Sequence, residues 1–212
     1  MTRSSMDHAT LNHLQEGSET DPFTESRYVQ FARLLPPGRL RILDVGCNTG
    51  RGGAVLKKLR PELQIHGLDL LQSRLDRLPK DVYAGTVCGS ATQIPSDDGS
   101  YDAVVAGEFI EHLLPMDAHH FVADAFRVLK LRGRLMLTTP NPGDLKLRLR
   151  GGTVLGGAHL SQHHPGTFKS VLKMYGFSRV RIMGSGKVSW YLGSRFPYLG
   201  IYGSYLAVGE KA

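Results

Sequence analysis

Residues 41–50 have the sequence Arg-Ile-Leu-Asp-Val-Gly-Cys-Asn-Thr-Gly, and the other predicted elements are arranged around them. The apolar run with one embedded acid, Asp44, predicts a buried parallel strand over residues 42–45. The turn that follows contains three residues that tolerate a positive φ and let a ligand approach the backbone: Gly46, Asn48 and Gly50. Thr49 is expected to cap a helix that continues to about Leu59. A strand, a tight turn and a helix in this order predict a nucleotide-binding βα unit.

A second acid, Asp69, ends the next predicted strand, residues 64–70. A carboxylate at that point can accept hydrogen bonds from both ribose hydroxyls of a nucleoside. The first turn lacks the G-x-G-x-x-G spacing that holds a pyrophosphate. Asp44 lies two residues before that turn, where a carboxylate can help to hold a cationic amino-acid ligand. Together these details favour adenosylmethionine over a dinucleotide.

Three motifs, taken together, resemble those of the class I S-adenosylmethionine-dependent methyltransferases, of the type 11/23-like small-molecule O-methyltransferase kind. They are residues 43–50, residues 66–70, and residues 101–105 followed by residues 108–113. The resemblance extends over about residues 39–186 and implies S-adenosyl-L-methionine as the cofactor. Asn48 stands where the family commonly has glycine, but we expect little loss because asparagine enters the left-handed region readily.

The cofactor site that we predict contains ten residues, combining the turn, the two acids and the ends of the neighbouring strands. They are Asp44, Gly46, Cys47, Asn48, Gly50, Asp69, Leu70, Ser90, Ala91 and Glu108. In the family that the chain resembles, the residues after the third strand usually meet the adenine, often through an acid. That acid is missing here, so we expect backbone and apolar contacts, such as those of Ala91 and Ile94, to hold the adenine.

Alternating strand and helix patterns predict an α/β fold with a doubly wound, Rossmann-like sheet. The resemblance adds that the last strand inserts antiparallel into a mostly parallel sheet. The strands are expected at residues 42–45, 64–70, 82–88, 101–107, 133–139, 177–183 and 204–209, and the helices at residues 23–35, 50–59, 71–78, 115–130 and 165–175. We expect a single methyltransferase domain over residues 21–212. The polar residues 1–20 are interpreted as a disordered segment or as a flap ordered by a ligand.

The net charge of +7 is distributed unevenly. Residues 1–129 contain 13 Lys and Arg against 17 Asp and Glu, whereas residues 130–212 contain 13 against 2. The basic portion is either a solvated face or a face toward an anionic acceptor or surface. Residues 190–205, which include Arg195 and follow Lys187, are interpreted as a packed insertion between the last two strands. The alternative is that they rest on a membrane surface.

Cysteine usage and hydropathy indicate the compartment. Cys47 and Cys88 are interpreted as reduced core thiols. The sequence contains no apolar run typical of a signal peptide or long enough to span a bilayer. We therefore expect a cytoplasmic protein, with peripheral membrane association as the alternative.

Residues 108–113 follow the fourth strand, at the edge where open α/β sheets bind ligands. An acceptor hydroxyl must lose its proton when it is methylated, and His112 has an ordinary pKa suited to a general base. We predict His112 as that base, with Glu111 and His159 shaping the acceptor pocket. In the alternative without a catalytic role, Glu111 only caps the next helix and His112 only bonds a carbonyl.

A metal-dependent alternative uses four of these side chains. Glu-x-x-Glu-His at residues 108–112, followed by His159 nine residues before Phe168, resembles the metal-dependent small-RNA 3′-terminal 2′-O-methyltransferases. The first part also resembles ubiquinone-pathway O-methyltransferases. In this alternative the protein ligands of a divalent cation are Glu108, Glu111, His112 and His159. Many small-molecule methyltransferases share the Glu-His pair without a metal, so a metal is not the favoured prediction.

We therefore predict O-methylation of a sugar, lipid-linked or natural-product hydroxyl, on an acceptor that is small or lipid-linked and could be anionic. One alternative is a metal-dependent RNA 3′-terminal 2′-O-methyltransferase, and another is a non-catalytic scaffold that binds the cofactor. Nucleic acid is the less favoured acceptor because the chain carries no separate RNA module. Acceptor selection is expected to depend on residues 143–164 and 187–203.

Overall fold

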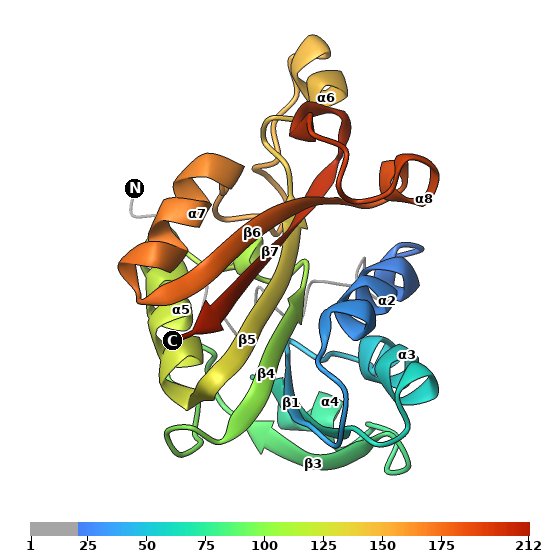
Figure 1. Cartoon of the computed structure of the whole chain (residues 1–212), viewed down its shortest axis with the longest axis vertical. Coiled ribbons are helices and arrows are strands. Elements are labelled where there is room, and N and C mark those ends of the chain that lie inside the picture. Colours follow the sequence, from blue (N-terminus) through green and yellow to red (C-terminus); the bar gives the residue numbers. More distant parts are fainter. Residues whose placement is uncertain (1–20) are drawn as a thin grey trace, which may run out of the picture.

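The computed structural model describes residues 21–212, so the interpretation of residues 1–20 lies outside the described part of the chain. Within it, a seven-stranded sheet has the order β3-β2-β1-β4-β5-β7-β6 (Figure 1). The strands are β1 Arg41–Val45, β2 Gln64–Asp69, β3 Tyr83–Cys88, β4 Tyr101–Gly107, β5 Leu129–Pro140, β6 Phe177–Ser185 and β7 Ser204–Lys211.

The pairing confirms the predicted Rossmann-like sheet. β1 pairs in parallel with β2 and with β4, and the ladder continues in parallel to β3 on one side and to β5 on the other. The last strand, β7, is antiparallel to both of its neighbours, β5 and β6. Because the chain moves outward from β1 to β3 and then returns to β4, the strand order reverses between β1 and β4, where such sheets bind ligands.

Helices cover both faces of the sheet. They are α2 Thr24–Leu34, α3 Arg51–Leu59, α4 Gln72–Leu75, α5 Pro115–Val128, α6 Leu145–Leu149, α7 Pro165–Met174 and α8 Val188–Leu192, with 3-10 turns η2 Ile110–His112 and η3 Leu199–Ile201. α5 and α7 lie on one face, and α2 and α3 lie on the other (Figure 1).

Strand alternation divides the core into two apolar layers. In β1, Leu43 and Val45 pack with the side chains of α5 and α7, whereas Ile42 packs with those of α2 and α3. On the second face, α3 approaches β1 and α2 so closely that a Cβ on Gly52 would lie 2.1 Å from Cζ of Tyr28. Glycine is therefore required at that position for the helices to pack.

Several local expectations need correction. α3 begins after Gly50, which is its N-cap at φ 81°, and no side chain caps the helix, so Thr49 does not. α4 has only four residues, whereas a helix over residues 71–78 was expected. α6 was not expected, because a five-residue helix with no buried residue leaves no apolar period to detect. α7 ends as expected, with Gly176 at φ 91° after its last turn.

The aromatic residues of the predicted insertion between β6 and β7 differ in their exposure. Tyr202 and Tyr205 are fully buried, as packing between the last strands requires. In contrast, Trp190, Tyr191 and Tyr198 have more than half of their surface exposed. Within residues 21–212, no helix is long and apolar enough to cross a bilayer.

Candidate active site

Two adjoining cavities lie at the carboxyl ends of β1, β2 and β4. The first cavity, of about 400 Å³, is lined by residues that follow β1, β2, β3 and β4. The second cavity, of about 410 Å³, is bounded by the N-terminal part of α2, the turn after β1, η2 and residues 156–159. The lining residues that the two cavities share include Gly46, Asn48, Glu108 and His112.

The turn after β1 has the conformation that its glycines predict. Gly46 and Asn48 have φ values of 65° and 46°. A Cβ on Gly46 would lie 2.5 Å from Cδ2 of Phe109, so only glycine fits. The backbone N–H of Asn48 donates to Oδ2 of Asp69 at 3.2 Å, and the N–H of Leu71 donates to Oδ1 at 3.0 Å. These bonds hold the Asp69 carboxylate beside the first cavity.

Seven of the ten predicted cofactor residues line the first cavity: Gly46, Asn48, Asp69, Leu70, Ser90, Ala91 and Glu108. Cys47 lines only the second cavity, and burial raises the pKa of its thiol. Gly50 lines neither cavity, because it faces Leu78 and Tyr83. Ile94 is also outside the first cavity, since its side chain is 2% exposed in the core.

Asp44 lies outside both cavities, contrary to the expectation that it contacts the ligand. Its side chain is fully buried, and its two oxygens accept hydrogen bonds from the hydroxyls of Tyr28 at 2.6 Å and Tyr83 at 2.7 Å. Burial raises the pKa of Asp44 to about 6, although both hydrogen bonds oppose the shift. Asp44 therefore links Tyr28 of α2 and Tyr83 of β3 to β1, and its contact with the ligand stays a prediction.

The cysteines are both free within the described chain, but they occupy different environments. Cys47 is buried in the turn after β1, as expected of a core thiol. Cys88 at the end of β3 is exposed, so the expectation that it packs in the core is wrong. Its sulfur lies 3.8 Å from the carbonyl oxygen of Leu70.

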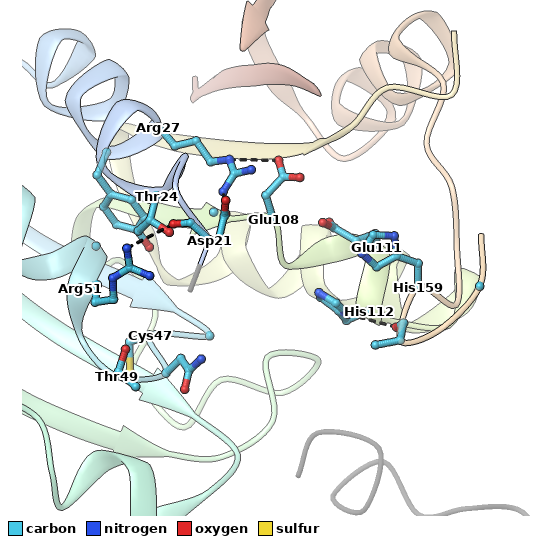
Figure 2. Close-up of a pocket in the computed structure, with 17 residues that line it drawn as sticks. Asp21, Thr24, Arg27, Cys47, Thr49, Arg51, Glu108, Glu111, His112 and His159 are labelled. Atoms are coloured by element: carbon cyan, nitrogen blue, oxygen red, sulfur yellow. Dashed lines mark hydrogen bonds and ion pairs between the residues drawn. The ribbon is translucent and has the colours of Figure 1, made fainter. Parts of the chain in front are cut away.

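Three charged residues of the second cavity were not predicted: Asp21, which precedes α2, Arg27 of α2 and Arg51 of α3 (Figure 2). Arg27 is 6% exposed, forms an ion pair with Asp21, and holds its Nε 3.4 Å from Oε1 of Glu108. Burial raises the pKa of Glu108, and the charge of Arg27 opposes the shift. The sequence offered one sign of this role, because Arg27 directly precedes Tyr28, a residue of the apolar face of the predicted helix.

On the other side of the second cavity, η2 and residues 154–161 bring together three predicted catalytic residues (Figure 2). One potential ligand atom from each of Glu111, His112 and His159 lies within 4.8 Å of the other two. The two imidazole rings meet edge to face at 5.0 Å between centroids. Nδ1 of His112 lies 3.0 Å from the carbonyl oxygen of Ala158, and Nδ1 of His159 lies 2.8 Å from that of Val154.

Burial and the contact with Ala158 decide the protonation and the tautomer of His112. Burial lowers the pKa of His112, which favours a neutral ring. In a neutral imidazole whose Nδ1–H donates to a carbonyl, the lone pair is on Nε2. The ring can therefore accept a proton or bind a metal through Nε2.

Glu111 is the most deeply buried acid of the second cavity, at 1% exposure. Its Oε2 accepts a hydrogen bond from the hydroxyl of Thr139 at 3.0 Å, whereas its Oε1 has no hydrogen-bond partner within residues 21–212. Burial raises the pKa of Glu111 strongly, and the charge of Glu108 adds to the shift. α5 begins after Leu114 without a side-chain cap, so Glu111 does not cap that helix.

The sheet order, the antiparallel β7 and the cavities at the point where the strand order reverses define a Rossmann-like α/β protein. Residues 43–137 match the family model described as a methyltransferase domain. Malonyl-[acyl-carrier protein] O-methyltransferase of Laribacter hongkongensis is 34% identical over 135 residues, which are 58% of this chain and 45% of that protein.

Two further comparisons agree with that match. The mitochondrial ubiquinone biosynthesis O-methyltransferase of Bos taurus is 27% identical over 187 residues, 77% of this chain and 49% of that protein. The structure of a SAM-dependent methyltransferase from Archaeoglobus fulgidus superposes with a TM-score of 0.66 at 20% identity, covering 88% of this chain and 92% of that one. These comparisons identify residues 43–137 as a methyltransferase domain, on a chain with the fold of the S-adenosylmethionine-dependent methyltransferases. The chain spans about half the length of the two enzymes named above.

Proposed function

We propose that this chain transfers a methyl group from S-adenosylmethionine to a hydroxyl oxygen of a small or lipid-linked acceptor, such as a sugar or natural-product hydroxyl. The observation that carries the proposal is the position of His112, which lines both cavities. A base at the junction of a cofactor cavity and an acceptor cavity can take the acceptor's proton where methyl transfer occurs.

The first cavity fits the adenosine part of the cofactor. Gly46 keeps the backbone turn open to the ligand, because any Cβ there would collide with Phe109. Asp69 presents a carboxylate that can accept hydrogen bonds from ribose hydroxyls, and Ser90 and Ala91 provide a surface for the adenine. When bound, the cofactor supplies an electrophilic methyl group on a positively charged sulfur.

The cofactor's methionine part carries both an ammonium and a carboxylate group, and the second cavity offers charges of both signs. Glu108 lies at the boundary of the two cavities and suits the ammonium group. Arg27, which pairs with Glu108, and Arg51 of α3 also line this cavity and suit the carboxylate. We therefore add these two arginines to the cofactor-binding residues.

His112 acts as the general base in this proposal. Its Nδ1–H donates to the carbonyl of Ala158, which fixes the ring and leaves Nε2 to accept the hydroxyl proton. Glu111 and His159 line the acceptor side of the same cavity and can orient the hydroxyl. The oxygen that loses its proton to Nε2 would form the new bond to the methyl carbon as the carbon–sulfur bond of the cofactor breaks, with S-adenosylhomocysteine as the leaving group.

A pair of measurements on His112→Ala tests the assignment. First, titration calorimetry with S-adenosylhomocysteine is expected to give affinities within about threefold for the wild type and the variant, since the base does not hold the adenosine. Second, release of S-adenosylhomocysteine is measured with a panel of sugar, quinol and lipid-linked hydroxyl acceptors. The variant is expected to lose about 10²- to 10⁴-fold in rate on any active acceptor. Equal turnover by both proteins would remove the base assignment.

A second candidate is metal-assisted methyl transfer, the chemistry of the RNA-end alternative. The observation that favours it is the buried Oε1 of Glu111, which has no hydrogen-bond partner in the described chain and lies in the cluster with His112 and His159. These three side chains, with Glu108 nearby, offer the mixed carboxylate and imidazole ligands that Mn²⁺ or Fe²⁺ accepts, and a bound cation would acidify an acceptor hydroxyl.

Calorimetry with Mn²⁺ separates the two candidates. Metal-assisted transfer predicts saturable binding that Glu111→Gln weakens at least tenfold, together with loss of turnover in chelator. The base-only proposal predicts turnover that chelator leaves unchanged. Binding of cofactor without turnover of any acceptor would support the non-catalytic scaffold instead, and steeply salt-dependent RNA binding would support the RNA-end enzyme.

A further inference from the structure

An exposed surface at one end of the molecule combines apolar and basic side chains. It consists of residues 145–150, which contain α6, and residues 187–198, which contain α8, and it is called here the basic aromatic surface. Its exposed apolar side chains are Leu145, Leu149, Trp190, Tyr191, Leu192, Phe196 and Tyr198. Its exposed basic side chains are Lys146, Arg148, Arg150, Lys187 and Arg195.

The size of the exposed apolar groups distinguishes this surface from an ordinary solvated face. Leu149 is 79% exposed and Tyr191 is 75% exposed. Half of the large hydrophobic residues that are exposed in the described chain belong to the basic aromatic surface, although it is a small part of the molecule. Exposed large apolar side chains in this number are typical of an interaction site.

Charge limits the kind of partner. Asp144 is the only acid in residues 141–203, and its side chain accepts a hydrogen bond from the backbone N–H of Lys146 at the start of α6. None of the five basic side chains of the surface forms an ion pair within residues 21–212. The partner must therefore be anionic and must also accept leucine, tryptophan and tyrosine side chains.

The elements of the surface are connected to one another and to the second cavity. α6 packs against η3, and Nδ2 of Asn141 donates to the carbonyl of Leu199 at 2.9 Å. The ring centroids of Trp190 and Phe23 are 5.8 Å apart. Phe23 directly precedes α2, whose first residues line the second cavity. The chain leaving α6 continues to His159 on the opposite wall. Figure 1 shows α6 and α8 toward the end of the molecule where β4 and β5 terminate.

We infer that the basic aromatic surface binds the surface of an anionic lipid bilayer and brings the mouth of the second cavity to it. Tryptophan and tyrosine favour the interface between headgroups and acyl chains, leucine and phenylalanine enter the acyl boundary, and lysine and arginine meet anionic headgroups. A nucleic acid would use the basic and aromatic groups but gains little from Leu149 and Leu192. The inference extends the lipid-linked acceptor of the proposed function, and bilayer binding is measured without cofactor or turnover.

Sedimentation of the full chain with vesicles tests the inference. Vesicles of phosphatidylcholine with phosphatidylglycerol are expected to retain the protein, whereas pure phosphatidylcholine vesicles are not. Raising NaCl from about 50 mM to about 500 mM is expected to release it, because the attraction of basic side chains to the surface is screened. Because the binding needs no enzymatic turnover, failure of the methyltransferase proposal would leave this result unchanged.

Matched variants locate the contact. Removing the three charges of α6 by K146Q/R148Q/R150Q is expected to weaken partitioning about fivefold per charge, on the order of 100-fold in total. The control K58Q/R77Q/K80Q removes three exposed charges elsewhere and is expected to have a much smaller effect. Tyr191→Ser is expected to weaken binding, whereas Leu131→Ser, at the same 75% exposure on β5, is not. Thermal melting confirms that each variant folds.

Each other outcome overturns the inference. Equal retention by neutral and anionic vesicles, or none by either, contradicts an anionic bilayer as the partner. Equal losses in the α6 variant and its charge control would mean that net charge alone drives binding. Light scattering that shows a dimer, abolished by Tyr191→Ser, would assign the surface to a second copy of the chain. Binding of short RNA that the α6 variant loses, without vesicle binding, would assign it to nucleic acid.

Discussion

Replacing Asp44 by asparagine is expected to change how stability depends on pH. The carboxylate is fully buried between the hydroxyls of Tyr28 and Tyr83, and burial raises its pKa from 3.8 to about 6. Since the folded pKa lies above the unfolded one, the folded state holds more protons than the unfolded state between about pH 4 and pH 6. The contribution of Asp44 to the free energy of unfolding is therefore largest below pH 4 and falls as the pH rises through 6.

The size of the effect follows from the shift. A pKa difference of roughly two corresponds to about 3 kcal/mol of stability lost between pH 4 and pH 6. Asparagine can keep both tyrosine contacts, because its oxygen accepts from one hydroxyl and its amide donates to the other. Asp44→Asn should therefore remove the loss while keeping the hydrogen bonds to Tyr28 and Tyr83.

Urea denaturation between pH 4 and pH 7.5 measures this effect, with tryptophan fluorescence and circular dichroism as independent probes. Glu108 and Glu111 also have raised pKa values and contribute the same sign, so only the difference between wild type and variant isolates Asp44. That difference should change by about 3 kcal/mol over the window, in favour of the variant at higher pH. Parallel curves for the two proteins would refute the assignment of a raised pKa to Asp44.

Three further changes test the packing and the site. In urea denaturation, Gly52→Ala should lower the free energy of unfolding by about 1–3 kcal/mol, because the new Cβ would overlap a tyrosine ring. The control Gly166→Ala places its Cβ in open space and should change that free energy by less than about 1 kcal/mol. Arg27→Gln should cost about 3–5 kcal/mol by leaving Glu108 buried without its cation, and a double-mutant cycle with Glu108→Gln should recover part of that loss. Asp69→Asn should weaken S-adenosylhomocysteine binding about 10- to 100-fold in calorimetry, since a carboxylate that accepts hydrogen bonds becomes a neutral amide; unchanged affinity would exclude a direct contact.

The strands were predictable because their signals are local. β4 has the bounds that its apolar run indicates, and the other strands differ from prediction mainly at their ends. The same holds for the positive φ values of Gly46 and Asn48, which depend on residue type within one turn. By contrast, α6 has no buried residue, so neither periodicity nor burial could reveal it.

The roles of buried charged residues were not predictable from local pattern. The position of Asp44 in β1 is compatible both with a ligand contact and with a buried structural contact. Only the approach of α2 and β3 surrounds its carboxylate with hydroxyl groups. Arg27 likewise acquires its role when α2 packs against β4, the strand that precedes Glu108. Long-range packing therefore decides which acids of a strand end face a cavity and which are sealed behind it.

The proposed base and the loop that we expect to select the acceptor are connected through the backbone. The carbonyl of Glu111 accepts hydrogen bonds from the N–H groups of Leu160 and Ser161, at 2.8 and 3.1 Å. The carbonyls of Ala158 and Val154 in turn hold the rings of His112 and His159. None of these bonds depends on the type of side chain that residues 151–158 carry. That loop can consequently present different side chains to different acceptors while η2 and the two histidines keep their positions, so substitutions that leave its backbone intact should alter acceptor preference without moving the base.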